Sequence, residues 1–188
     1  MKQITSLALA LLCGIASATS VDWSLAGKSF TTSDGTNERA KNYYVTVFLY
    51  SDYNDVMNIV KSWDAPVSDT SASALNQYIR EGATAKTSAS GAASGGFNLD
   101  STTYPSVTTV SLFMIAWDGE TIGGANNYIV SGTVSSDAYA GTDTPTSTGE
   151  FKNTTFENSS WKPIAVPEPS TAALALAGLA LLLKRRKA

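Results

Sequence analysis

Alternating apolar and polar positions recur along the chain and predict β-strands. The clearest run is Tyr43 to Ser51, in which aliphatic side chains face one side and mostly aromatic side chains face the other. Val21 to Leu25 alternates with polar residues, as a half-buried strand does. Val107 to Trp117 contains continuous apolar residues, which is typical of a central strand covered on both faces. These three segments predict a sheet with at least one central strand.

Weaker patterns predict further strands and the loops between them. Asn127 to Val134 is expected to be a strand with a bulge at Gly132, because a glycine inside a strand pattern often marks one. Phe97 to Leu99 and Phe151 to Phe156 are weaker strand candidates. Ala83 to Gly96 consists mostly of small residues, and this composition predicts an exposed loop.

Two short segments have the spacing of an amphipathic helix. Apolar side chains from Val56 to Trp63 recur at i, i+3, i+4 and i+7, and Pro66 ends the pattern. Leu75 to Ile79 has a shorter apolar face, with Gly82 as its expected C-terminal stop. Both helices are expected to pack beside the sheet.

The fold class that these patterns predict is mainly β. We expect a single β-sandwich-like domain over residues 19–161 with two short helices, because strands with apolar faces need a facing layer. The alternative is an α+β fold, in which a single antiparallel sheet has the helices on one face.

The N-terminus has the parts of a secretory signal peptide. Lys2 supplies a positive charge, a mostly apolar stretch follows, and Ala16 and Ala18 place small side chains where signal peptidase requires them. We therefore predict that residues 1–18 are a signal peptide, cleaved after Ala18, and that signal peptidase is a processing partner. The single cysteine, Cys13, lies inside this segment.

The C-terminus has a second composite pattern. Residues 162–170 are expected to be a linker containing Pro167, Glu168 and Pro169, and residues 171–183 are free of charge. The latter predict a short transmembrane helix, about 20 Å long against a hydrocarbon core of about 30 Å. Residues 184–188 are expected to stop the segment and to remain cytoplasmic by the positive-inside rule. Their charges are those of Lys184, Arg185, Arg186 and Lys187.

These parts, in this order, resemble the PEP-CTERM family of sorting tails over the residues from Val166 to Ala188. The resemblance implies that Pro167, Glu168 and Pro169 are a sorting motif for an exosortase, a membrane enzyme of Gram-negative bacteria. It implies that the protein is first anchored in the inner membrane with its body outside. It also implies cutting near the motif, a final place at the cell surface or outside the cell, and an association with exopolysaccharide.

Composition narrows the chemistry of the body. The chain of 188 residues has no histidine and one cysteine, which excludes histidine-based catalytic sites and cysteine-clustered zinc sites. We expect no cofactor and no metal ion. Between the signal peptide and the tail, acidic residues outnumber basic ones, and this argues against nucleic acid as a partner.

Acidic pairs stand at the ends of two predicted strands: Asp52 with Asp55, and Asp118 with Glu120. Paired carboxylates can serve glycoside hydrolysis or bind calcium. The same residue types are common as helix caps and turn residues, and we favour this interpretation. A hydrolase would need two of these carboxylates to converge in one cleft, about 5–10 Å apart.

Aromatic residues offer one further candidate. An exposed tryptophan could form a platform for sugars, whereas the aromatic residues of a small β domain usually form its core. The four tryptophans are Trp23, Trp63, Trp117 and Trp161. We expect a non-enzymatic surface or matrix protein, without catalytic residues, that an exosortase sorts. The alternatives are a carbohydrate-binding or adhesion module and a glycoside hydrolase that uses carboxylates alone.

Overall fold

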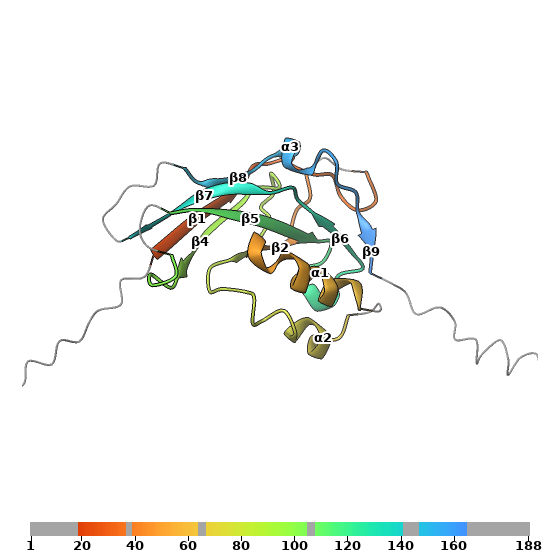
Figure 1. The fold of residues 1–188 in the computed structure, drawn as a ribbon. Coiled ribbons are helices and arrows are strands. Elements are labelled where there is room, and N and C mark those ends of the chain that lie inside the picture. The colour runs from red at the N-terminus through yellow and green to blue at the C-terminus, as the bar shows by residue number, and fades with distance from the viewer. Residues whose placement is uncertain (1–18, 37–38, 64–66, 105–107, 141–146, 165–188) are drawn as a thin grey trace, which may run out of the picture.

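The computed structural model describes residues 19–36, 39–63, 67–104, 108–140 and 147–164. These residues form one sheet of nine strands with three α-helices, so the predicted mainly β class is confirmed (Figure 1). The expected signal peptide (1–18), transmembrane helix (171–183) and basic end (184–188) lie outside the described residues. Within the described ranges, no helix has the length and apolar character that crossing a membrane requires.

The elements follow one another along the chain with short helices between strands. The strands are β1 (Thr19–Leu25), β2 (Tyr44–Leu49), β3 (Thr84–Lys86), β4 (Ala93–Leu99), β5 (Thr108–Trp117), β6 (Asn127–Val130), β7 (Val134–Ala140), β8 (Gly149–Phe151) and β9 (Lys162–Pro163). The α-helices are α1 (Tyr53–Lys61), α2 (Asp69–Ser73) and α3 (Asn153–Phe156). Two 3-10 helices are η1 (Tyr50–Asp52) and η2 (Ile122–Gly124).

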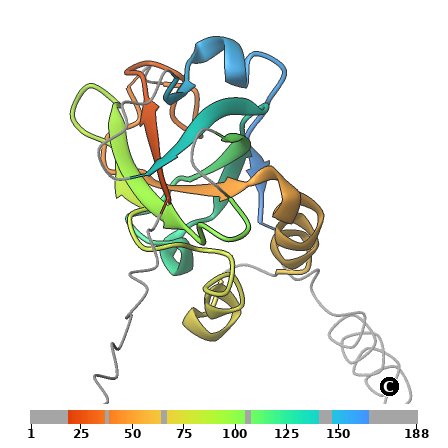
Figure 2. The same cartoon turned by 60° about the vertical axis from the view of Figure 1, so that its left-hand side comes forward.

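The sheet has the strand order β3-β2-β5-β7-β1-β4, with β6 beside β5, β9 beside β6 and β8 beside β1. Neighbouring strands are antiparallel except β1 and β8, which are parallel. The sheet curls, so that β3 and β4 at its two edges come into contact (Figure 2). At this edge the indole N–H of Trp23 donates to the carbonyl oxygen of Gly82 at 3.2 Å. The expected β-sandwich is not confirmed, because every described strand belongs to this one curled sheet.

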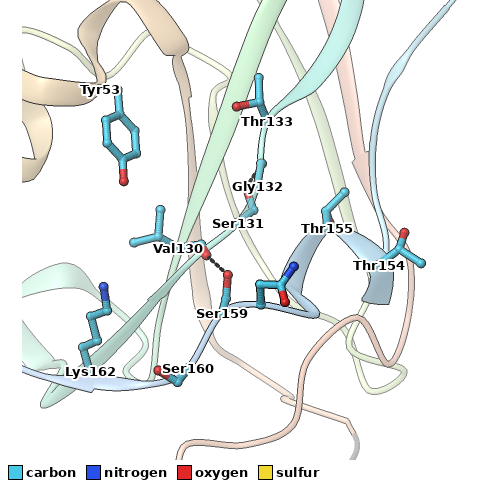
Figure 3. Close-up of a pocket in the computed structure, with 11 residues that line it drawn as sticks. Tyr53, Val130, Ser131, Gly132, Thr133, Thr154, Thr155, Ser159, Ser160 and Lys162 are labelled. Atoms are coloured by element: carbon cyan, nitrogen blue, oxygen red, sulfur yellow. Dashed lines mark hydrogen bonds between the residues drawn. The ribbon is translucent and has the colours of Figure 1, made fainter.

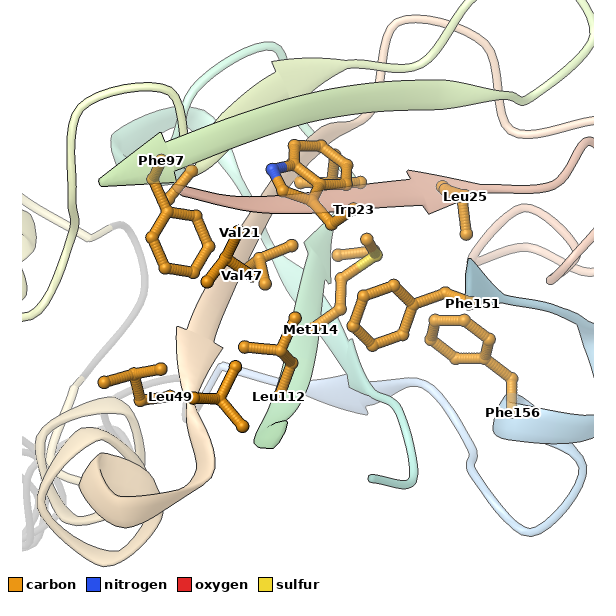
Figure 4. Close-up of a cluster of buried hydrophobic side chains, with 14 of the residues drawn as sticks. Val21, Trp23, Leu25, Val47, Leu49, Phe97, Leu112, Met114, Phe151 and Phe156 are labelled. Atoms are coloured by element: carbon orange, nitrogen blue, oxygen red, sulfur yellow. The ribbon is translucent and has the colours of Figure 1, made fainter. Parts of the chain in front are cut away.

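An inner core fills the concave side of the curl. It takes every second residue of β2 and β5, starting from Val45 and from Val110, together with the inward side chains of β1, β4 and β8. Its largest side chains include those of Trp23, Leu25, Leu112, Met114 and Phe151 (Figure 4). Each such side chain stabilises the fold by about 1.5–3 kcal/mol relative to an exposed position.

An outer core covers the opposite face of β2 and β5. The strands contribute Phe48, Phe113, Ile115 and Trp117. The covering residues come from α1 and from the segment around α2, and they include Val56, Met57, Val60, Val67 and Leu75. β5 is therefore covered on both faces, as its continuous apolar pattern predicts.

The predicted loop from Ala83 to Gly96 is wrong, because this segment contains β3 and the first part of β4. Its small residues serve close packing at the edge of the sheet. A Cβ atom added at Gly95 would lie 2.6 Å from the carbonyl oxygen of Gly82 and 2.8 Å from the ring of Trp23. Low side-chain volume is therefore a packing requirement here and not a mark of exposure.

The predicted bulge lies between β6 and β7. Ile115 of β5 lies opposite Val130 of β6, and Leu112 of β5 lies opposite Val134 of β7. The two positions are three residues apart in β5 but four residues apart in the segment that pairs with it. One extra residue is thus accommodated in the segment 131–133, as in a β-bulge. The strand prediction ended at Val134, whereas β7 continues to Ala140 because it pairs with β1 as well as with β5.

The two predicted helices differ in how well they agree with the structure. α1 contains Val56, Ile59 and Val60 of its predicted apolar face, but Trp63 lies beyond its end. The prediction of a helix over Leu75 to Ile79 is wrong, because α2 begins at Asp69 and ends at Ser73. The cause is a cap, because the hydroxyl oxygen of Ser68 accepts a hydrogen bond from the backbone N–H of Ser71 at 3.0 Å. Leu75 follows the helix in a turn and is still buried in the outer core. α3 occupies part of the predicted strand Phe151–Phe156.

The first strand starts at the predicted cleavage boundary. Thr19 is fully buried and pairs with Leu99 of β4 and Ala140 of β7. Its hydroxyl donates to the carbonyl oxygen of Tyr104 at 2.8 Å. The pairing of β1 with its neighbours therefore begins at Thr19 itself.

The last strand lies beyond the predicted end of the domain at residue 161. Lys162 and Pro163, which the sequence assigns to the linker, form β9 against β6. Ile164 is 1% exposed, and its backbone N–H donates to the carbonyl oxygen of Asn126 at 2.8 Å. The folded body thus extends through Ile164, and only residues 165 and 166 separate it from Pro167.

Candidate functional site

A polar pocket of about 430 Å³ lies where the bulge, α3 and the C-terminal strand meet. Its walls are Tyr53 of α1, the bulge segment 130–133, Thr154 and Thr155 of α3, and the chain from Asn158 to Lys162 (Figure 3). The sheet divides at this place, because β7 continues to β1 whereas β6 continues to β9. Bulges are common beside functional sites because they bend a strand and redirect its side chains.

Hydrogen bonds within the protein fix the inner wall of this polar pocket. The hydroxyl oxygen of Ser131 accepts from the backbone N–H of Met114 at 2.9 Å and donates to the carbonyl oxygen of Gly132 at 2.7 Å. The backbone N–H of Gly132 donates to the carbonyl oxygen of Thr155 at 2.6 Å. The hydroxyl of Ser159 donates to the carbonyl oxygen of Val130, as the dashed line in Figure 3 shows. The bulge is therefore held to both neighbouring segments.

The rim of the polar pocket has side chains whose polar atoms form no hydrogen bond or ion pair with another described residue. They are Tyr53, Thr133, Thr154, Asn158, Ser160 and Lys162. All are exposed except Tyr53, which is half-buried. The ring of Tyr53 is held by edge contact with Phe113, at 5.0 Å between ring centroids, and by Tyr50 at 5.3 Å.

The described lining consists mostly of neutral hydrogen-bonding groups. Lys162 is the charged residue of the described lining, and the other polar groups are hydroxyls and one amide. Burial raises the pKa of Tyr128, and the neighbouring Tyr53 raises it further, so the Tyr128 phenol stays neutral at physiological pH. The described lining contains no carboxylate, so it lacks the acid–base pair that a hydrolase needs.

A second hollow of about 500 Å³ lies between α2, the segment 79–84 and η2. It is wider and shallower than the polar pocket. Its cation Arg80 is already engaged, by Asp52 at 3.5 Å and by the carbonyl oxygen of Tyr78 at 3.3 Å. This hollow therefore offers a less prepared site.

The acidic candidates lie at opposite ends of the sheet. β2 and β5 are antiparallel, with Tyr44 opposite Trp117 and Leu49 opposite Leu112. Asp52 and Asp55 follow the end of β2, whereas Asp118 and Glu120 follow the end of β5, so the length of β2 separates the two pairs. At about 3.4 Å per residue this length is roughly 17 Å. The structure does not bring the two pairs together in one cleft.

The carboxylates of these candidates serve local structure. Asp118 accepts from the backbone N–H groups of Asn126 and Asn127 at 2.8 Å each, and from the side-chain amide of Asn127 at 2.6 Å. Glu120 pairs with Lys86 at 3.0 Å. Asp52 stands at the N-cap position of α1 but makes no side-chain cap there. Among the described residues, no three His, Cys, Asp or Glu side chains are grouped to hold a metal ion.

The tryptophans belong to the core rather than to an exposed platform. Trp23, Trp63 and Trp117 are buried. Trp161 is half-buried, and its indole N–H donates to the carbonyl oxygen of Thr31 at 2.9 Å. Among the described large hydrophobic residues, Tyr50 is the exposed one, at 47%.

The C-terminal residues after Ile164 match a known sorting motif. Residues 165–187 match the model of the PEP-CTERM protein-sorting motif. The chain ends in a PEP-CTERM tail. The resemblance read from the Pro-Glu-Pro sequence, the apolar segment and the basic end is thereby confirmed. No curated protein and no solved structure matches the chain.

The PEP-CTERM tail indicates an exported protein that an exosortase sorts to the cell envelope or surface. It begins at residue 165, directly after the buried Ile164. The matched residues include Pro167, Glu168 and Pro169 and end with the basic residues from Lys184 to Lys187. These residues, like Ala16 and Ala18, lie outside the described part of the chain.

The sequence patterns did not predict the polar pocket. Its residues come from four separate segments, and of these patterns only the expected bulge at Gly132 lies in that region. Ser and Thr are frequent throughout the chain, so the run 153–160 has no distinguishing composition. The division of the sheet between β7 and β6 creates the pocket, and this division depends on pairing that sequence periodicity does not show.

Proposed function

We propose that the chain is an exported, non-enzymatic protein of the cell surface or extracellular matrix that an exosortase processes at Pro167, Glu168 and Pro169. The observation that supports this most directly is the place of the PEP-CTERM tail, which starts directly after Ile164, the last described residue of the body. Cutting near the motif leaves β9 and Ile164 in place, because both precede it.

The N-terminus fits the same route. With Ala16 and Ala18 as signal peptidase recognition residues, cleavage after Ala18 leaves Thr19 as the first residue. β1 begins at Thr19 and pairs from that residue onward. The proposed cleavage therefore leaves every described strand residue in place.

The proposed membrane intermediate rests on the charge pattern of the tail. Residues 171–183 would span the inner membrane as a short helix. Lys184, Arg185, Arg186 and Lys187 would hold its end in the cytoplasm, because cytoplasmic flanks are rich in basic residues. This orientation places the Pro-Glu-Pro residues near the outer face, together with the body.

A structural or matrix role, associated with exopolysaccharide, is supported by what the carboxylates do. Asp118 is engaged by its own turn, and Asp52 and Glu120 are paired with basic residues. A glycoside hydrolase would need one carboxyl group as an acid and another as a base or nucleophile. The tail, which resembles those of exopolysaccharide-producing bacteria, supports a polysaccharide matrix as the surroundings.

The sorting step is tested by Glu168→Ala, with Glu157→Ala, an exposed residue of the body, as the matched control. Wild type and Glu157→Ala should appear in the surface or medium fraction without the tail. Glu168→Ala should remain full-length in the inner membrane, because the sorting enzyme no longer recognises its substrate. Mass spectrometry of the fractions measures both outcomes. Wild-type surface protein that still contains Lys184 to Lys187 would contradict the proposal.

Export is tested separately at the N-terminus. Replacing Ala16 and Ala18 by bulky residues should leave the precursor uncut, because the pockets of signal peptidase admit small side chains only. N-terminal sequencing should give Thr19 for wild type. A mature N-terminus that is unchanged in the double variant would place the cleavage site elsewhere.

A further inference from the structure

We propose that the polar pocket beside the C-terminal strand is a carbohydrate-binding site that takes a sugar unit of a surface polysaccharide. The inference deepens the proposed association with exopolysaccharide and rests on it for the source of the ligand. It makes the pocket residues, and not the tryptophans, the recognition surface. The starting observation is a pocket of about 430 Å³ at a β-bulge, lined by neutral hydrogen-bonding groups and one lysine, Lys162.

The lining matches the chemistry of sugar hydroxyls. Each sugar hydroxyl both donates and accepts a hydrogen bond, and the same is true of the hydroxyls of Thr133, Thr154 and Ser160. The Asn158 amide adds two N–H donors and one carbonyl acceptor. In the described part of the chain these groups have no hydrogen-bond partner, so they are available to a ligand.

The pocket also has an apolar wall. The ring of Tyr53 stands against Phe113 and is held in a fixed orientation, and the side chain of Val130 lies beside it. An aromatic ring of this kind can pack on the C–H face of a pyranose, while the tyrosine hydroxyl remains free for a hydrogen bond. A few polar groups placed around an apolar wall is the usual composition of a small-ligand site.

The frame of the pocket is already organised. Bonds from Ser131 to Met114, from Gly132 to Thr155 and from Ser159 to Val130 join the bulge to β5, α3 and the C-terminal segment. The rim groups therefore stand on a fixed backbone, which lowers the entropy cost of binding. The volume falls within the range of about 300–1,000 Å³ that is common for ligand pockets.

Other ligand classes fit this lining less well. A divalent cation needs carboxylate oxygens, and none lines the described pocket. A phosphate or sulfate ion favours several cationic or N–H donors, whereas Lys162 is the one cation in the described lining. A peptide strand needs a free sheet edge, but both edges of β6 are paired, by β5 and by β9, and Ser159 engages the carbonyl of Val130.

The experiment uses the full chain, purified in a detergent whose headgroup contains no sugar. The purified protein is tested on an array of short neutral and hexuronate-containing oligosaccharides. Calorimetry then measures its affinity for the oligosaccharide that binds best. Wild type should bind at least one of these glycans. The double variant Asn158→Ala/Ser160→Ala should bind it about 10-fold more weakly, because two hydrogen-bonding groups are lost.

The matched control is Asn76→Ala/Ser73→Ala, which removes the same side-chain types from the second hollow. This control should bind as wild type does. A second comparison is Tyr53→Ala against Tyr50→Ala, because the two rings touch but Tyr53 alone lines the pocket. Circular dichroism melts show whether each variant remains folded, and the exposed Asn158 and Ser160 keep the test valid if Tyr53→Ala unfolds.

Two results would overturn the carbohydrate site. One is the absence of binding to every glycan of the array by folded wild-type protein. The other is binding that the control variants weaken as much as the pocket variants do. Neither result bears on sorting, which the mass of the surface protein reports independently.

Discussion

The two faces of the central strands differ in how they are closed. The inner core is enclosed by the sheet itself, which curls until β3 and β4 meet. The outer core is covered by α1, the short α2 and connecting turns. Both the polar pocket and the second hollow involve residues that pack against the outer core, such as Tyr53, Val130 and Ile79. The inner face is thus closed by the sheet, and both of the recesses described above border the outer core.

The difference follows from hydrogen bonding. A strand is held to its neighbours by a ladder of backbone bonds, whereas a short helix satisfies its own backbone and rests on side-chain contacts. The cover of the outer face can therefore shift more easily than the curl of the sheet. Changes that leave an empty volume should cost more inside the curl than beneath the helices.

The largest effect should come from a matched pair of leucines. Leu112 in β5 belongs to the inner core and Leu75 after α2 belongs to the outer core, and both are fully buried. Leu112→Ala should lower the free energy of unfolding by about 4 kcal/mol, and Leu75→Ala by about 2–3 kcal/mol, because the helical cover can partly collapse. Urea unfolding of both variants measures this. Equal losses would remove the distinction between the two faces.

The edge where the curl closes should be nearly as sensitive. Gly82 has φ +84°, and an added Cβ would lie 2.0 Å from the carbonyl oxygen of Gly96. Gly82→Ala should therefore cost about 3 kcal/mol, from strain and from separation of the edges. Gly35 has φ +71° with open space around it, so Gly35→Ala should cost only about 1 kcal/mol. Thermal melts of the two variants compare them, and similar values would mean that the closure is loose.

A single hydrogen bond of the outer core should give a smaller change. The indole N–H of Trp117 donates to the hydroxyl oxygen of the buried Thr46 at 3.4 Å. Thr46→Val keeps the shape but removes the acceptor, and it should cost about 1 kcal/mol. Thr109→Val, at an exposed position of β5, should change stability by less than about 0.5 kcal/mol. A larger loss at Thr109 would show that the exposed strand end matters more than the buried bond.

The smallest effect should be the response to acid. Hydrogen bonds from Thr32 and Thr36 lower the pKa of Asp34, and those from Thr102 and Thr103 lower the pKa of Asp100, below the ordinary value of 3.8. A carboxyl group with a lowered pKa in the folded state stabilises that state above its unfolded pKa. The contribution is lost as pH falls through the folded pKa. Stability should therefore begin to decrease below about pH 4.

The acid experiment also compares the two cores. Asp34 and Asp100 lie on exposed loops outside both cores. Two variants are compared, one that keeps only Trp23 of the inner core and one that keeps only Trp117 of the outer core. The tryptophan fluorescence of both variants should accordingly report acid unfolding at the same pH. NMR titration of the carboxyl carbons should give midpoints below 3.8 for both residues. Separate transitions for the two tryptophans would mean that the faces unfold independently.

Sequence patterns predicted the parts of the fold whose burial is set by local alternation. β2, β5 and α1 have side chains with clear periods, and each is found close to its predicted bounds. The bulge near Gly132 was also predicted, because a glycine inside a strand pattern often marks one. The PEP-CTERM tail was the most readable segment, since its meaning depends on order and composition rather than on tertiary contacts.

The remaining features depend on contacts between distant segments. The small residues of β4 allow close packing, because Gly95 lies against Trp23 and Gly82. The sequence of β4 alone does not reveal these contacts. The curl of the sheet follows from strand order, which periodicity leaves open. The polar pocket needs both the bulge and the course of the chain after α3. Such features require the pairing pattern before they can be read.

The pairing of β1 has a consequence for the timing of export. β1 is the first described strand, yet its partners β4, β7 and β8 all come much later in the chain. Contacts between distant segments form slowly, because a long loop must close before they are made. Most of the body must therefore emerge on the far side of the membrane before its first strand has a place to dock. Translocation would deliver an unfolded chain, and the sheet would assemble only when the body has crossed and the tail remains in the membrane.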